Sequence, residues 1–137
     1  NIAKVEEHHI HGEKCTCMVH RKGATRAMPG QPVLVPGDMG TGSWLLEGMA
    51  NNRAFASSCH GAGRVLSRSQ AKRQIDGKAL KRELESRGIR IHANTPNIMS
   101  EEAPDAYKNV DEVIQLSNDA GLAKPIARMM PLAVIKG

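Results

Sequence analysis

Residues 57–68 read Ser57-Ser58-Cys59-His60-Gly61-Ala62-Gly63-Arg64-Val65-Leu66-Ser67-Arg68. In this stretch a histidine heads a flexible Gly-Ala-Gly segment, and two arginines follow it. Flexible backbone lets main-chain N–H groups approach phosphate oxygens closely, and arginine adds charged, bidentate donors for the same oxygens. A histidine among such groups can act as a nucleophile, a proton shuttle or a metal ligand, and the spacing alone does not choose among the three.

The residues that follow predict how this histidine is presented. Residues 64–74 have the polarity of a surface helix that begins just after Gly63. The first turn of a helix carries a partial positive charge and free N–H groups, which favour phosphate. We therefore expect His60 to lie near a helix N-terminus.

The rest of the chain predicts short strands and two further helices. Strands are expected at residues 5–11 and 15–20, joined by a turn at Gly12, and at residues 31–35 and 43–47. Downstream we expect a helix at 78–87 with Leu80 and Leu84 on one face, followed by a strand at 89–93 and a loop at 94–100. Asn109 is expected to cap a helix at 110–119, with Val113, Leu116 and Ala120 on one face. The last expected element is an extended segment at 126–135, interrupted by Pro131.

These elements predict an α+β fold with mixed sheets and surface helices, because the regular βα alternation of a doubly wound sheet is missing. A length of 137 residues suits a single domain spanning residues 1–137. Only 2% of the residues are aromatic, so aliphatic side chains and seven methionines must fill its core.

The charge of the chain bears on its partners. The formal net charge is +5, and basic residues cluster at Arg21, Lys22 and Arg26 and again at Arg64, Arg68, Lys72 and Arg73. This pattern is typical either of a polyanion-binding face or of an ordinary basic surface. Since stacking aromatic residues are nearly absent, recognition of nucleic-acid backbone and ends is favoured over base readout.

The cysteines and the hydropathy bear on location. Three cysteines, an odd count, do not suggest a disulfide framework and fit a reducing compartment. No stretch is long and apolar enough for a membrane span or a signal peptide. We expect a cytoplasmic protein without membrane contact.

Four further motifs accompany the histidine motif. They are Val19-His20-Arg21-Lys22-Gly23-Ala24-Thr25-Arg26, Gly30-Gln31-Pro32-Val33-Leu34 leading to Met39-Gly40-Thr41-Gly42-Ser43, Glu101-Glu102-Ala103-Pro104-Asp105-Ala106-Tyr107-Lys108, and Pro131-Leu132-Ala133-Val134-Ile135-Lys136-Gly137. With these five motifs the chain resembles the RtcB-type RNA ligases, and the resemblance covers the whole chain in family order.

The resemblance implies a reaction. In the family, the residue matching His60 attacks the α-phosphate of GTP and forms a histidine–GMP intermediate, with Mn²⁺ as the metal. GMP then passes to an RNA 3′-phosphate, and a 5′-hydroxyl displaces it to seal tRNA halves or other broken RNA ends. Attack requires a neutral imidazole, and an ordinary histidine pKa of about 6.5 leaves much of the ring neutral near pH 7.

The resemblance also implies roles for other residues. The nucleotide-binding positions are His60, Gly61, Ala62, Gly63, Ser43, Tyr107 and Lys136. The RNA-phosphate positions are Arg21, Lys22, Arg26, Arg64 and Arg68. Asp38 departs from the family, where serine is common, and the segment between Arg26 and Gln31 is shorter than in many members.

The metal ligands are expected elsewhere. Family members are longer, and this chain resembles their C-terminal part. A metal-binding histidine of the family stands immediately before the asparagine that matches Asn1, so the resemblance places the manganese ligands upstream of Asn1 and none in this chain. His8, His9, His11, Cys15 and Cys17 are close in sequence, but His8 and His9 fall on opposite faces of a strand, so we do not expect a zinc site there.

Three hypotheses follow. The first is the nucleotide-binding part of a GTP- and manganese-dependent RNA ligase, completed by an N-terminal portion or a second chain. The second is a basic module that holds RNA or nucleotide without catalysis. The third is that the chain is the retained piece of a larger protein. RNA specificity, oligomeric state and independent folding are left open.

Overall fold

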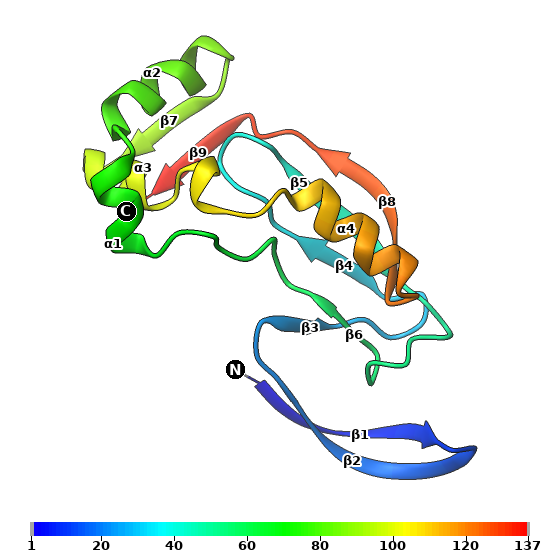
Figure 1. Ribbon diagram of the computed structural model, residues 1–137. Helices are drawn as coiled ribbons and strands as arrows, with labels where there is room; N and C mark the ends of the chain where they lie inside the picture. Colours follow the sequence, from blue (N-terminus) through cyan, green and yellow to red (C-terminus); the bar gives the residue numbers. More distant parts are fainter. Residues whose placement is uncertain (1, 137) are drawn as a thin grey trace.

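The computed structural model describes residues 2–136, so Asn1 and Gly137, which belong to two of the quoted segments, lie outside it. Figure 1 shows short strands and helices in irregular order. The strands are β1 (Ile2–Ile10), β2 (Glu13–Arg21), β3 (Ala24–Arg26), β4 (Pro32–Val35), β5 (Ser43–Gly48), β6 (Ser57–Cys59), β7 (Arg90–Ala93), β8 (Ala123–Met129) and β9 (Ala133–Lys136). The helices are α1 (Arg68–Gln74), α2 (Gly77–Ser86), α3 (Pro96–Glu101) and α4 (Val110–Asp119), with a 3-10 turn at Pro104–Ala106.

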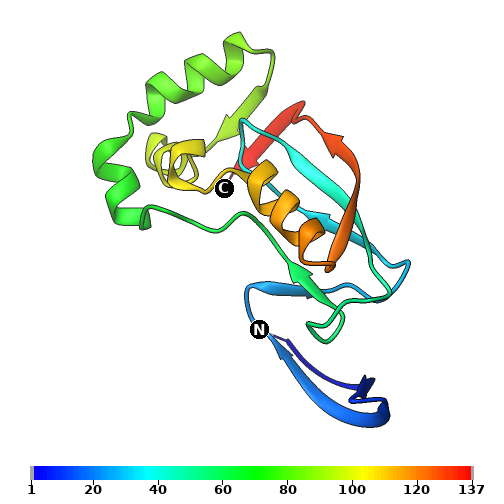
Figure 2. The same ribbon diagram turned by 45° about the vertical axis from the view of Figure 1, so that its right-hand side comes forward.

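The strands pair in four small sheets. β4, β5 and β8 form an antiparallel sheet in the order β4-β5-β8, and α4 lies along one of its faces (Figures 1 and 2). β1 and β2 form a hairpin, β3 pairs with β6, and β7 pairs in parallel with β9 beside α2 and α3. This mixture is the expected α+β fold.

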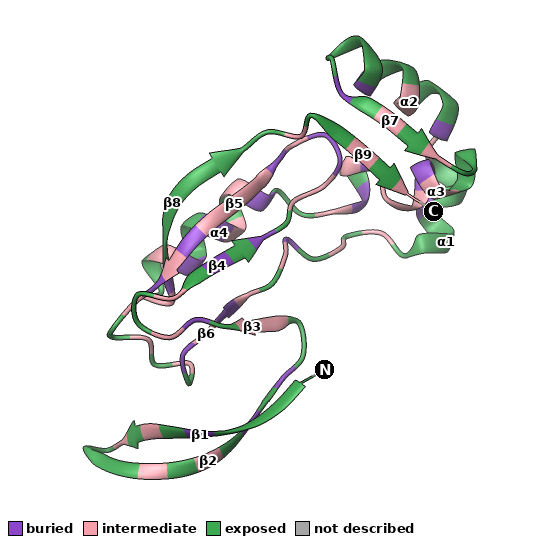
Figure 3. Cartoon of the chain, turned by 180° about the vertical axis from the view of Figure 1, so that it is seen from behind, coloured by how far each residue is buried: buried purple, intermediate pink, exposed green. Residues whose placement is uncertain are grey.

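Two apolar clusters hold the elements together, and the buried segments of the strands and helices are visible in Figure 3. The first lies between the three-stranded sheet and α4 and includes the fully buried Leu46 and Ile114. The second joins α2, α3 and β7 through Leu84, Ile89 and Met99. Each buried aliphatic side chain of this size contributes about 2 kcal/mol.

The expected pair of N-terminal strands, joined by a turn at Gly12, is confirmed. His11 and Gly12 have φ of 52° and 87°, so both turn residues are left-handed, which matches the twist of a two-residue hairpin loop. The strands are longer than expected and end directly at this turn. Strands at 31–35 and 43–47 and the helix around 78–87 are also confirmed, with small changes of boundary.

The expected helix at residues 64–74 begins later. It starts at Arg68, because Ser67 caps it: the Ser67 hydroxyl accepts from the Gln70 N–H, and the Gln70 side chain accepts in return from the Ser67 N–H. The expectation that His60 lies near a helix N-terminus is therefore wrong. Residues 60–67 are irregular, and His60 instead follows the short strand β6.

Other local predictions are corrected as well. Residues 96–101 form α3 rather than a loop, with Pro96 in its first turn, and β3 and β6 were not expected. The inner face of α4 carries Val110, Ile114 and Ser117 instead of the expected set, and Leu116 is 68% exposed. The extended C-terminal segment is confirmed as β8 and β9, with Pro131 between them.

Candidate nucleotide-binding site

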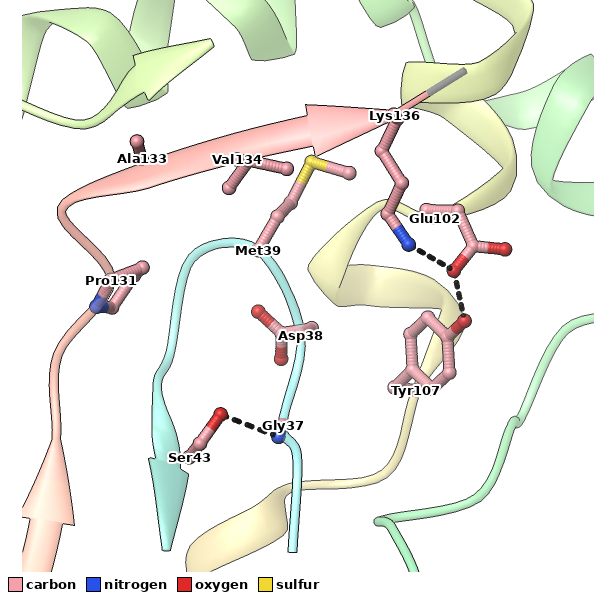
Figure 4. A pocket seen from close by; sticks show the side chains of 10 residues that line it. All are labelled: Gly37, Asp38, Met39, Ser43, Glu102, Tyr107, Pro131, Ala133, Val134 and Lys136. Carbon is pink, nitrogen blue, oxygen red and sulfur yellow. Dashed lines mark hydrogen bonds and ion pairs between the residues drawn. The ribbon is translucent and has the colours of Figure 1, made fainter. Parts of the chain in front are cut away.

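A pocket of about 240 Å³ lies between the three-stranded sheet and the β7–β9 pair (Figure 4). Three residues that the resemblance assigned to nucleotide binding line it together: Ser43 at the start of β5, Tyr107 after the 3-10 turn, and Lys136 on β9. They are distant in sequence, so their convergence is a property of the fold. The remaining lining includes Gly37, Asp38, Met39 and Glu102.

The loop between β4 and β5 forms one wall of the pocket. The Asp38 carboxylate accepts hydrogen bonds from the N–H groups of Gly40 and Thr41, at 2.8 and 2.9 Å, and from the Thr41 hydroxyl at 2.6 Å. The Ser43 hydroxyl accepts from the Gly37 N–H at 3.3 Å (Figure 4). Asp38, which departs from the family pattern, therefore shapes the loop that lines the pocket.

Glu102 stands opposite this loop, and sequence reasoning missed it. Its carboxylate accepts from the Tyr107 hydroxyl at 2.7 Å and lies 3.5 Å from the Lys136 ammonium (Figure 4). Burial acts to raise the pKa of Glu102, but the Tyr107 hydrogen bond and the charges of Lys136 and Arg64 outweigh it and lower that pKa. The available signal was its place in the Glu101–Lys108 motif, five residues before Tyr107.

Arg64 contacts both Tyr107 and Glu102. Its guanidinium lies 4.7 Å from the centre of the Tyr107 ring and donates to the Tyr107 hydroxyl at 2.8 Å and to the Leu66 carbonyl at 2.9 Å. A further bond goes to the Glu101 carbonyl. Three of the five N–H donors of Arg64 are therefore bonded inside the protein, and its contact with RNA phosphate stays a prediction.

Burial and the neighbouring carboxylate raise the pKa of the Tyr107 phenol. Tyr107 therefore stays protonated at neutral pH and acts as a hydrogen-bond donor to Glu102.

His60 is exposed and directly follows β6, whose Cys59 pairs with Ala24 of β3. A methyl group placed on Gly23 would come within 3.9 Å of the His60 Nε2 atom, so the turn that carries Lys22 lies beside the imidazole. His60 does not line the pocket, and neither do Gly61, Ala62 and Gly63, so the structure does not bring these four predicted nucleotide-binding residues into it.

The Gly-Ala-Gly segment contacts the chain neighbours of two pocket residues. A methyl group on Gly61 would meet the Pro36 carbonyl oxygen at 3.6 Å, next to the pocket residue Gly37. Ala62 is buried in the first apolar cluster. Gly63 has φ of 78°, a conformation that favours glycine, and its carbonyl accepts from the Lys108 N–H beside Tyr107.

The basic residues expected to bind RNA phosphates divide into two groups. Lys22, Arg26 and Arg68 are exposed. Arg21 is only 3% exposed, and its guanidinium donates to Glu6, Ser57 and the Phe55 carbonyl. Because these bonds use its donors inside the protein, the expected RNA-phosphate contact of Arg21 does not agree with the geometry.

The described residues hold no built metal centre. Between residues 2 and 136, no group of three or more histidine, cysteine, aspartate or glutamate side chains is placed to hold an ion. His8 and His9 point to opposite faces of β1, as expected, and His8 bonds Glu6 at 3.0 Å. The described part of the chain thus does not fit a manganese site by itself.

No helix within the described part of the chain is long and apolar enough to cross a bilayer.

Comparison with known proteins finds similarity over the whole chain. The family model for the tRNA-splicing ligase RtcB matches residues 1–137. The chain is 51% identical to the tRNA-splicing ligase RtcB of Pyrococcus abyssi, 50% identical to that of Thermococcus kodakarensis, and 48% identical to the RNA-splicing ligase RtcB of Mycobacterium tuberculosis. All of this chain is covered in each case, but it spans only 17%, 32% and 35% of these relatives, respectively.

Proposed function

This chain belongs to the RtcB family, and from that premise we propose that it provides the nucleotide pocket and the histidine nucleophile of a GTP- and manganese-dependent RNA ligase. The observation that carries the proposal is the convergence of Ser43, Tyr107 and Lys136 on one pocket, with the segment after His60 in contact with Pro36 and Lys108, the chain neighbours of two lining residues. The substrates would be RNA ends bearing a 2′,3′-cyclic phosphate or 3′-phosphate and ends bearing a 5′-hydroxyl.

The polar groups of the pocket suit guanine. Guanine carries an acceptor at O6 and donors at its N1 and exocyclic N2. The Lys136 ammonium is a donor of the kind O6 needs, and the ionised Glu102 carboxylate is an acceptor of the kind the N–H groups need. We place the base in this pocket and the phosphates along the Gly61–Gly63 backbone, toward His60.

His60 would begin the reaction. The lone pair of a neutral imidazole nitrogen forms a bond to the α-phosphorus of GTP, and the bond from that phosphorus to the pyrophosphate oxygen breaks, so pyrophosphate leaves with the electron pair. An RNA 3′-phosphate oxygen then takes the GMP from His60. Finally the 5′-hydroxyl attacks the activated 3′-phosphate, loses its proton and expels GMP, which leaves a phosphodiester.

The exposed basic residues would hold the RNA. Lys22 lies in the turn beside His60, and Arg68 opens α1 after the irregular segment. Lys22 offers charge for an RNA phosphate beside the nucleophile, and the exposed Arg26 and Arg68 would bind phosphates elsewhere along the strand. Manganese, when bound, would stabilise charge on the phosphates, and we expect its ligands upstream of Asn1 or on a second chain. A cytoplasmic location is part of this proposal.

A second candidate is a basic module that binds RNA or nucleotide without catalysis. The exposed positions of Lys22, Arg26 and Arg68 favour it, because phosphate binding needs only accessible charge. RNA binding that weakens steeply with salt, with no joined product under any condition, would select this candidate over the ligase.

The test is RNA joining by the complete product of the gene that encodes this chain. It is given GTP, Mn²⁺ and two RNA strands, one with a 3′-phosphate and one with a 5′-hydroxyl. We expect His60→Ala to abolish joining, because the nucleophile is lost. His9→Ala, which removes an exposed histidine of β1, is the matched control and should retain wild-type joining. Full activity of the His60→Ala variant would refute the proposal.

A further inference from the structure

Glu6 and Arg21 form a buried, bidentate ion pair inside the N-terminal hairpin. The Arg21 Nη1 and Nη2 atoms donate to the two Glu6 oxygens at 2.9 and 2.8 Å. The side chains of Arg21 and Glu6 are only 2% and 4% exposed, respectively. His8 bonds the Oε2 atom of the same carboxylate at 3.0 Å, so this oxygen has two partners.

The remaining donors of Arg21 reach the chain segment that leads to the nucleophile. Its Nε atom donates to the Ser57 hydroxyl at 2.9 Å, and its Nη2 atom donates to the Phe55 carbonyl at 2.7 Å. Ser57 is the first residue of β6, which ends at Cys59, directly before His60. Arg21 therefore contacts the segment three to five residues before the histidine.

This segment has an unfavourable backbone conformation. Phe55 and Ala56 have φ of 51° and 47°, although neither is a glycine. Such residues persist in the left-handed region only where their surroundings hold them. Here the Phe55 carbonyl is bound by Arg21, and the Phe55 ring packs edge-on against His8 with 5.4 Å between ring centres. The hairpin thus holds the strained turn in place.

The opposite side of β6 is fixed independently. The Ser58 hydroxyl shares a buried hydrogen bond of 3.0 Å with the Ser117 hydroxyl of α4, and Cys59 packs against the first apolar cluster. β6 also pairs with β3, and the Asn52 amide donates to the Ser57 carbonyl. The contacts with Arg21, α4 and the first apolar cluster add to this pairing, so the position of β6 depends on all of them.

We propose that Glu6 and Arg21 are positioning residues for His60: through Ser57 and the Phe55 carbonyl they fix β6, and so the direction from which the imidazole attacks. The inference rests on the function proposed above. It also gives Arg21 a role that differs from phosphate binding, because its N–H groups donate to Glu6, Ser57 and the Phe55 carbonyl. Small displacements of a reacting group lower rates steeply, so the effect is expected on the chemical step.

The experiment measures the first half-reaction, which contains no RNA. The complete gene product is mixed with GTP and Mn²⁺, and formation of the histidine–GMP adduct is followed in a single turnover over a range of GTP concentrations. We expect Arg21→Lys and Glu6→Gln to lower the maximal rate about 10- to 100-fold. The half-saturating GTP concentration should stay near the wild-type value, because the guanine pocket is untouched.

Two further variants separate positioning from loss of stability. Ser57→Ala removes only the β6 end of the network and should lower the maximal rate in the same direction, by a smaller factor. Asp76→Ala removes the N-cap of α2, whose carboxylate accepts from the Lys78 and Ala79 N–H groups, and serves as the destabilised control because Asp76 lies outside the pocket. It should lower the melting temperature but keep the wild-type maximal rate. Equal rate losses in Asp76→Ala and Arg21→Lys at matched melting temperature would overturn the inference.

A second readout does not depend on activity. Amide hydrogen exchange of residues 57–60 should be faster in Arg21→Lys than in wild type, while exchange in α2 stays unchanged. Normal adduct formation in Arg21→Lys, with a defect only in transfer to RNA that grows with salt, would show a phosphate contact and overturn positioning. Absence of any adduct in the wild-type protein would refute the proposed function itself, and positioning with it.

Discussion

Lys136 is the side chain whose role in the pocket is most directly testable. It lies near the end of β9 and pairs with Glu102 across the opening (Figure 4). A hydrogen bond to a charged group contributes about 1.5–3 kcal/mol. We expect Lys136→Met to weaken GTP binding about 10- to 100-fold. The measurement is a GTP titration of the complete gene product.

Lys124→Met is the matched control for this substitution. Lys124 also sits on a C-terminal strand and pairs with a glutamate, Glu47, but it lies outside the pocket. GTP affinity should be unchanged in this variant. Equal affinities of Lys136→Met and wild type would place the guanine elsewhere.

At the residue scale, the sequence motifs name residues but do not show their surroundings. Ser43, Tyr107 and Lys136 meet in one pocket, while their binding to nucleotide stays a prediction. Arg21 and Arg64 are named as phosphate ligands, but Arg21 is buried in an ion pair and Arg64 bonds the Tyr107 hydroxyl. Arginine is charged wherever it lies, so only its three-dimensional neighbours show whether it is free or paired.

At the scale of elements, the hairpin and β6 are joined by an acid-sensitive pair. The hydrogen bonds from Arg21 hold the pKa of Glu6 at about 2, below its ordinary 4.5, although burial acts to raise it; the bond with His8 adds to the lowering. Because the folded-state pKa is depressed, the stabilisation is fully present above about pH 4.5 and is lost as the pH falls toward 2. The shift corresponds to about 3 kcal/mol.

This pair predicts a difference between wild type and Glu6→Gln in urea unfolding between pH 6 and pH 3. The unfolding free energy of the wild type exceeds that of Glu6→Gln at pH 6, and this difference should shrink by about 2 kcal/mol at pH 3. The reason is that Glu6 takes up a proton in the unfolded chain over this range, whereas glutamine does not titrate. Glu7→Gln, which alters the exposed neighbour paired with Lys14, is the control and should follow the wild type. An advantage that does not change with pH would contradict the ion-pair account.

Elements with a strong local pattern were predictable, and those fixed by tertiary contacts were not. The hairpin and α2 follow from alternation, a turn glycine and a helix-ending glycine. β3 and β6 have three residues each and exist because they pair with one another. The late start of α1 was encoded by Ser67 and Gln70, a capping pair that outweighs the polar pattern of residues 64–67.

At the scale of the whole molecule, the pocket lies where the three-stranded sheet meets the group formed by α2, α3, β7 and β9. Its walls come from the β4–β5 loop of the sheet and from β9 and the segment after α3. Neither part contains the full set of pocket residues by itself, so the motifs predict the site only as a set of residues. Its shape required the packing of both apolar clusters.

The charge of the molecule predicts how RNA binding responds to salt. Each phosphate contact adds about 0.7 to the slope of log affinity against log salt for a single strand. Lys22→Gln in the complete gene product should lower that slope by about this amount. Lys81→Gln, which alters an exposed α2 lysine paired with Glu85, should leave the slope unchanged. Identical slopes for wild type and Lys22→Gln would exclude a phosphate contact at Lys22.

We expect His60 to become covalently bound to GMP. The most direct measurement is the intact mass of the complete gene product after incubation with GTP and Mn²⁺, followed by peptide mapping. The protein should gain the mass of one GMP, located on His60 and absent from His60→Ala. No gain, or a gain that maps to another residue, would contradict it.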